Sequence, residues 1–187
     1  MTAIVGIQLK NAAVIAGDSR ITYNDKPYAA KGIEKVITKD EYVIAFAGDD
    51  QAANIAQYLW QPPKVSRVMD TDKFMMSKVL PSLRKAMIDN GYNPDPADRD
   101  AGFDALVAFD GIIYEISHYY SFSRDDGGFY AIGGGGNLAL GAVAMVGPKT
   151  IKDAEEVAIK AIQISANYNT TVGGETQVTV QRSRNVH

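Results

Sequence analysis

Hydrophobic and polar residues follow two different periods along the chain, and the change of period separates predicted strands from predicted helices. In the first 48 residues, apolar and β-branched residues recur at alternate places around two short polar turns, Lys10-Asn11 and Lys39-Asp40-Glu41. Apolar runs on both sides of a short polar turn are typical of hairpins, so the sheet is predicted to begin antiparallel. The strands predicted in this way span residues 3–9, 12–16, 35–38 and 42–47.

Helical spacing replaces this alternation after residue 48. Asp49-Asp50 can cap a helix that runs to about residue 60, and Pro62-Pro63 ends it. A second helix is predicted over residues 71–90, where Pro81 marks a kink or a break.

The second half of the chain repeats this order. A polar segment with two prolines, residues 93–102, predicts a surface loop, and Asp110-Gly111 predicts the turn of a hairpin. His118 is predicted to lie on a strand beside Tyr119 and Tyr120. The further predicted strands are 105–109, 112–116, 130–132 and 177–181, and the further predicted helices are 137–146 and 150–167.

The order of these elements is strands, two helices, strands, two helices and one strand. Blocks of strands and helices favour a layered α+β domain over a doubly wound sheet, in which the two types alternate. A length of 187 residues fits one domain spanning residues 1–187.

Composition narrows the possible functions. The chain has 19 Lys and Arg against 22 Asp and Glu, and the net charge of -3 argues against nucleic-acid binding. Because there is no cysteine, thiolate catalysis and cysteine-type zinc sites are excluded. No apolar run is long enough to predict a membrane span, and the first residues lack the pattern of a signal peptide. We therefore expect a cytoplasmic protein.

Thr2 is the first residue that could carry chemistry. Met followed by a small residue is a processing site for methionine aminopeptidase, which would leave Thr2 as the N-terminal residue. A free N-terminal threonine joins a hydroxyl nucleophile to an amine with a pKa of roughly 7.7–8.0, so the amine can act as a base near neutral pH. Many proteins begin with Met-Thr without this chemistry, so a role for Thr2 as a nucleophile depends on the motifs elsewhere in the chain.

Those motifs resemble proteasome β subunits, and equally HslV, the peptidase subunit of the bacterial two-component ATP-dependent protease. The resemblance covers nearly the whole chain, and the order and spacing of its four N-terminal motifs are specific. The residues that carry it are 2–7, 14–20, 31–36, 44–48, 130–136 and 172–174.

The resemblance implies a role for four residues. Thr2 matches the nucleophile, Asp18 the buried acid, Lys35 the lysine beside the nucleophile, and Gly48 the glycine whose N–H forms the oxyanion hole. These roles are chemically consistent, because a cation at Lys35 would lower the pKa of the Thr2 amine and a backbone N–H can stabilise the developing oxyanion. Taken singly, each residue also has an ordinary interpretation: a turn residue, a surface charge or a strand-to-helix turn.

The resemblance further implies a fold and an assembly. The fold would be the four-layer αββα sandwich of N-terminal-nucleophile hydrolases, and the reaction would be peptide-bond hydrolysis through an acyl-enzyme on Thr2. Identical subunits would form rings around polypeptide substrates, with an AAA+ unfoldase as a plausible partner. No cofactor and no metal are implied.

Three positions depart from the family pattern. Gly134 stands where the family has a serine, and Asn169 and Val172 stand where it has an acid and a second serine. Thr171 or Ser165 could substitute in part. These departures keep open a catalytically inactive subunit with a role in assembly, and a third alternative is a hydrolase of small amides.

A nucleotide site is a weaker alternative. Residues 134–139 fit the G-x-G-x-x-A pattern, but the acids about 20 residues further on fall in a predicted helix instead of at a strand end. The glycines therefore do not predict a dinucleotide site.

Overall fold

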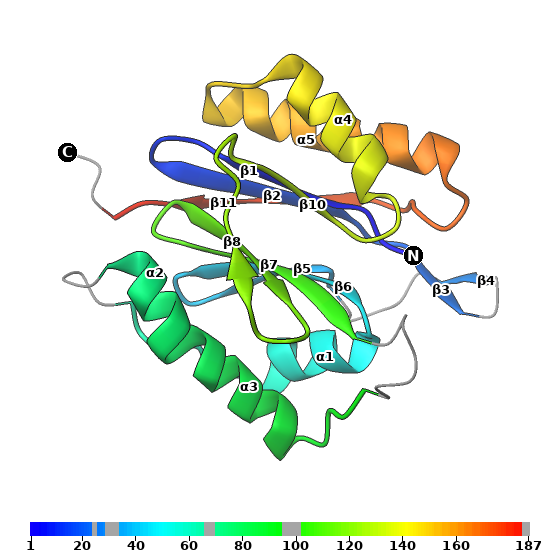
Figure 1. Ribbon diagram of the computed structural model, residues 1–187. Helices are drawn as coiled ribbons and strands as arrows, with labels where there is room; N and C mark the ends of the chain where they lie inside the picture. The colour runs from blue at the N-terminus through cyan, green and yellow to red at the C-terminus, as the bar shows by residue number, and fades with distance from the viewer. Residues whose placement is uncertain (24–25, 29–33, 66–69, 95–101, 185–187) are drawn as a thin grey trace.

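The computed structural model describes the chain apart from residues 24–25, 29–33, 66–69, 95–101 and 185–187. Much of the surface loop predicted over 93–102 lies outside the described residues, as does part of the 31–36 motif. Figure 1 shows two sheets facing one another, with helices on the outer side of each.

Four strands form the first sheet, in the order β10-β1-β2-β11, with every neighbouring pair antiparallel. The predicted hairpin around Lys10-Asn11 is present, with Val5 opposite Ala16. The strands are β1 (Ile4–Gln8), β2 (Ala12–Asp18), β10 (Phe129–Ile132) and β11 (Thr176–Arg182).

Five antiparallel strands form the second sheet, in the order β5-β6-β7-β8-β9. Asp110 and Gly111 make the predicted turn between β7 and β8, and both have positive φ angles, 51° and 76°. The strands are β5 (Val36–Lys39), β6 (Tyr42–Gly48), β7 (Phe103–Phe109), β8 (Ile112–Ser117) and β9 (Phe122–Ser123).

The alternation of side chains explains why several strands are apolar throughout. Val5 and Ile7 on β1 pack toward α4 (Gly136–Val146) and α5 (Ile151–Tyr168), whereas Ile4 packs between the two sheets. In the second sheet, Val107 faces the helices below it and Leu106 faces the first sheet. Because each sheet is covered on both faces, neither side of these strands can be polar.

Helices of the first half of the chain cover the outer face of the second sheet (Figure 1). Helix α1 (Asp50–Asn54) is capped by Asp49, as predicted, and continues in π-helical form through Ile55–Leu59. The helix predicted over residues 71–90 comprises α2 (Thr71–Phe74), a π-helical segment (Met75–Val79) and α3 (Leu80–Asp89).

Pro81 does not end that helix. It lies in the first turn of α3, directly after the π-helical segment, and a wider turn at this point accommodates a residue that has no N–H to donate.

The structure also differs from the prediction in places, among them the unpredicted two-residue strand β9. A small hairpin, β3 (Ile21–Tyr23) with β4 (Lys26–Tyr28), follows β2 near the N-terminus (Figure 1). The strand predicted at His118 is wrong, because β8 ends at Ser117 and the chain turns there. The backbone N–H of Tyr120 bonds the Ser117 carbonyl and closes that turn, and Tyr120 has a positive φ of 59°.

Candidate active site

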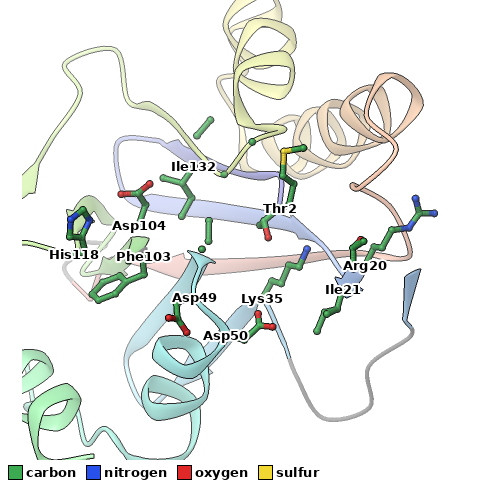
Figure 2. A pocket seen from close by; sticks show the side chains of 18 of the residues that line it. Thr2, Arg20, Ile21, Lys35, Asp49, Asp50, Phe103, Asp104, His118 and Ile132 are labelled. Carbon is green, nitrogen blue, oxygen red and sulfur yellow. The ribbon is translucent and has the colours of Figure 1, made fainter. Parts of the chain in front are cut away.

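The strand ends of both sheets bring the predicted site residues to one edge of the molecule. Thr2 precedes β1, Asp18 ends β2, Lys35 precedes β5 and Gly48 ends β6. Thr2, Lys35 and Gly48 line a cleft of about 1040 Å³, and Figure 2 shows the Lys35 side chain directed toward Thr2. Asp18 lies beneath them and is only 1% exposed.

The Asp18 carboxylate is fully engaged. Its Oδ1 accepts hydrogen bonds from the Ala3 N–H at 2.9 Å and the Lys35 ammonium at 2.8 Å, and its Oδ2 accepts one from the Gly173 N–H at 3.0 Å. Three donors, one of them a cation, compensate for burying a charge that would otherwise be costly. Asp18 therefore ties the N-terminal segment to Lys35 and to the segment after α5.

Lys35 is held at both ends. Its ammonium pairs with Asp18, and its backbone N–H donates to Gln177 Oε1 at 3.2 Å, so β11 fixes the start of β5. Its side chain is only 10% exposed. Burial lowers the pKa of Lys35 below its usual 10.5, while the charge of Asp18 and its hydrogen bond oppose that effect. The result is a positioned cation at the floor of the cleft.

The glycine-rich turn after β10 packs against Thr2. The Gly135 N–H donates to the Thr2 carbonyl at 3.0 Å, and Gly133 has a φ of +83°. A Cβ on Gly133 would collide with the Thr2 carbonyl oxygen. Glycine at 133 is therefore required both by backbone conformation and by the close approach of the N-terminal segment.

Gly48 is also a conformational requirement. Its φ is +103°, and a Cβ there would collide with the Gly102 carbonyl oxygen. Gly48 is the last residue of β6 and precedes Asp49, which caps α1. The backbone thus turns sharply beside Thr2, where any side chain would strain it.

Comparisons with known proteins concern the fold of the chain. No protein-family model and no curated protein matches the sequence. Among solved structures, BPH from Thiobacillus denitrificans in complex with epoxomicin has a TM-score of 0.76 at 20% identity, covering 96% of this chain and 98% of that chain. HslV from Trypanosoma brucei has a TM-score of 0.65 at 22% identity over 96% of this chain and 99% of that chain. Anbu from Yersinia bercovieri, described as an ancestral beta-subunit, has a TM-score of 0.69 at 15% identity over 96% and 82%.

The chain has the HslV fold. At these identities the comparison is one of fold, an α+β fold with two antiparallel sheets and helices. The resemblance predicted from the N-terminal motifs is confirmed at that level.

Of the three positions that depart from the family pattern, only Asn169 carries a polar side chain. Gly134 has no side chain, and a Cβ there would collide with the Met1 thioether. Val172 is fully buried and packs with the apolar residues under α5. The Asn169 carboxamide oxygen accepts hydrogen bonds from the Thr171 N–H and, at 2.7 Å, from the Thr171 hydroxyl. The Thr171 hydroxyl hydrogen is therefore used in the bond to Asn169.

Arg20 has a position that the sequence alone did not assign. Its Nη1 donates to the carbonyls of Thr170 at 2.9 Å and Val172 at 3.1 Å, and its backbone N–H donates to the Gly173 carbonyl. Arg20 therefore holds the segment whose Gly173 N–H reaches Asp18. The motifs 14–20 and 172–174 contain both partners, but nothing in them pairs residues 152 positions apart.

The wall of the cleft on the side away from Arg20 is acidic. Asp49 and Asp104 line it, and Figure 2 shows them, together with His118, on the side away from Arg20. Glu115 lines the same wall, and burial, followed by the nearby charges of Asp104 and Asp125, raises its pKa above the usual value.

Neither a metal-binding group of side chains nor a membrane-spanning helix is present in the described part of the chain. No group of three or more His, Asp or Glu side chains is placed to hold a metal ion. No helix in the described part of the chain is long and apolar enough to cross a membrane.

Proposed function

We propose that this chain is a subunit of a self-compartmentalising threonine endopeptidase, with Thr2 as its nucleophile once Met1 has been removed. In this proposal residues 1–187 form one domain, and its two sheets and outer helices are the four-layer αββα sandwich of the N-terminal-nucleophile hydrolases. Polypeptides are the substrates, and no cofactor takes part.

The buried ion pair beneath Thr2 carries the proposal. A lysine and an aspartate are costly to bury, and replacing such a pair by apolar residues often leaves a protein as stable or more so. Here the pair lies under the only residue of the N-terminal segment that combines a hydroxyl with a prospective amine, and Lys35 opens onto the cleft. A role in chemistry accounts for its place better than a role in stability.

The geometry supports a separate role for each group in the reaction. After Met1 is removed, the Thr2 amine takes the proton from Thr2 Oγ as that oxygen attacks a peptide carbonyl. The Lys35 cation disfavours a second positive charge nearby, so it lowers the pKa of the amine and keeps it basic at neutral pH. Asp18 holds Lys35 in place.

The remaining steps use the same groups. The backbone N–H of Gly48 would stabilise the oxyanion of the tetrahedral intermediate, a contribution of about 3 kcal/mol in comparable sites. The amine then returns its proton to the leaving amine of the substrate, and an acyl-enzyme on Thr2 Oγ remains. Water activated by the same amine releases the second product.

Assembly is part of the proposal. The Anbu complex of Pseudomonas aeruginosa, whose fold is similar, forms a helical assembly. We expect identical copies of this chain to form rings in the cytoplasm, with the clefts facing an inner chamber. An AAA+ unfoldase would deliver unfolded chains to such a chamber.

A specific observation favours a second candidate, a catalytically inactive subunit that serves assembly. Gly134 and Val172 offer the Thr2 amine no polar side chain, and the Asn169 carboxamide oxygen is bonded to Thr171. Such a subunit would either keep Met1, so that the Thr2 amine never forms, or lose Met1 and remain unreactive.

One measurement decides between the two candidates. The intact mass of the purified protein is recorded before and after incubation with a peptide epoxyketone such as epoxomicin, the compound in the BPH complex, which traps a threonine hydroxyl together with its own amine. The endopeptidase predicts loss of Met1 and a stoichiometric adduct that is absent in Thr2→Ala. Retention of Met1, or a processed chain that takes no adduct, would establish the inactive subunit.

A further inference from the structure

We infer that Ser165, a buried serine on α5, is a positioning residue for Thr2 and acts through Gly135. The inference rests on the proposed function, because it concerns how the proposed nucleophile is held in the absence of a hydroxyl at Gly134 and Val172.

The hydrogen bonds around the Thr2–Ala3 peptide group are the first step. Its carbonyl oxygen, on Thr2, accepts from the Gly135 N–H at 3.0 Å, and its N–H, on Ala3, donates to Asp18 Oδ1 at 2.9 Å. Both polar atoms of the peptide group next to the nucleophile are therefore held. This fixes the position of the Thr2 Cα atom and the direction of its Cα–C bond, from which the side chain that carries the hydroxyl extends.

Ser165 determines where Gly135 can lie. The Ser165 hydroxyl is fully buried and donates to the Gly135 carbonyl at 2.9 Å. Gly135 is thus bound on one side to α5 and on the other to Thr2, and helix α5 is a rigid element of 18 residues. Without this hydrogen bond the Gly135 carbonyl would lose a buried side-chain donor, and no hydroxyl of α5 would hold the turn.

Close packing makes the contact specific. A Cβ added to Gly135 would lie 2.5 Å from Ser165 Oγ, 2.7 Å from Val172 Cγ2 and 2.9 Å from Ala3 Cβ. Only a glycine lets the turn approach α5 closely enough for the Ser165 hydroxyl to reach it. Val172, which stands where the related family has a serine, fills the apolar side of the same contact.

The consequence concerns rate and not substrate binding. Ser165 does not line the cleft, so its loss leaves the substrate contacts in place. Since small displacements of reacting groups cost large factors in rate, we expect Ser165→Ala to lower kcat about tenfold with KM unchanged. The rate of epoxomicin adduct formation should fall by the same factor.

The experiment compares the wild type with three variants, using a fluorogenic peptide for kcat and KM and thermal unfolding for stability. Ser165→Cys keeps a weak donor of similar size and should give an intermediate kcat, and the chain has no other cysteine to complicate it. Ile162→Val is the matched control, because Ile162 is buried one turn earlier on α5 among apolar residues and does not contact Gly135 through a hydrogen bond. It should lose stability and retain wild-type kcat.

The outcomes separate the two claims. A low kcat in Ser165→Ala, intermediate in Ser165→Cys and normal in Ile162→Val supports the positioning role. A normal kcat in Ser165→Ala overturns the positioning role, and so do losses of kcat that follow the unfolding temperature in all variants. In either case an epoxomicin adduct on the wild type still supports the proposed function. A wild type that takes no adduct overturns both.

Discussion

Removing the charge of Asp18 should destabilise the protein strongly and in a way that depends on Lys35. Asn at this position keeps one oxygen acceptor but presents an NH₂ group where the carboxylate accepts from Lys35 or from Gly173. Because Asp18 is 1% exposed and the Lys35 side chain 10%, water replaces the lost partner poorly. Breaking a buried pair from one side typically costs about 3–5 kcal/mol, and we expect Asp18→Asn to lower the free energy of unfolding by that amount.

The pH dependence gives an internal check on the cause. In Asp18→Asn, burial would lower the pKa of Lys35 further, since the carboxylate that opposes the effect of burial is gone. Between that lowered pKa and 10.5, the unfolded chain binds more protons than the folded one, so stability rises with pH. The difference in the free energy of unfolding between wild type and Asp18→Asn should therefore become smaller as the pH is raised toward 10.

Urea unfolding followed by circular dichroism measures the free energy directly, provided that the slope with denaturant is unchanged. A double-mutant cycle with Lys35→Met isolates the pair. The costs of the two single variants should exceed the cost of the double variant by about 0.5–3 kcal/mol. Additive costs, or a loss below about 1 kcal/mol in Asp18→Asn, would refute the view that this pair is a buried and coupled one.

Three further predictions follow from the cleft. Gly48→Ala should lower the free energy of unfolding by about 1–3 kcal/mol, because alanine at a φ of +103° would be strained and would collide with Gly102; an unchanged melting temperature contradicts this. Glu115→Gln should raise the melting temperature at neutral pH and lose that advantage in acid, since a carboxyl whose pKa is raised stabilises the fold only when protonated; a pH-independent difference would contradict the cause. Because the wall that carries Asp49 and Asp104 is acidic, peptides with Lys or Arg should be hydrolysed about tenfold faster at low salt than the same peptides with Glu. Added salt and Asp104→Asn should both reduce this preference. Equal rates would show that the acidic wall does not select substrates.

Most helices and strands could be predicted because their signals are local. The helix over 150–167 was predicted within a residue or so of α5, since Thr150 caps it and its apolar positions follow a helical period. His118 was misplaced because the apolar run before it continues into aromatic residues, and only the Ser117–Tyr120 hydrogen bond shows the turn. The small hairpin β3–β4 was not predicted because its strands have three residues each, which is too short to show an alternation of apolar and polar residues.

The residues of the candidate site could be predicted from the sequence, but their contacts could not. Thr2, Asp18, Lys35 and Gly48 could be named from motifs, because each lies in a short stretch whose residues resemble a known family. What they contact could not be named. That Asp18 accepts from Gly173 and not from solvent depends on β11 lying beside β2, a pairing of segments 155 residues apart.

The sequence alone therefore determined the elements, the layered α+β class and the four residues of the candidate site. The elements and the class depend on hydrophobic period, capping and turn chemistry, which act within a few residues of one another. The four candidate residues depend on short motifs that resemble a known family. Only the tertiary structure decided that Ser165 reaches Gly135 and that Arg20 binds the carbonyls after α5. Both contacts join segments that meet only after the sheets and α5 have packed. A hydrogen bond forms only within about 3 Å, so the partners of such long-range bonds follow from packing and cannot be inferred from spacing along the chain.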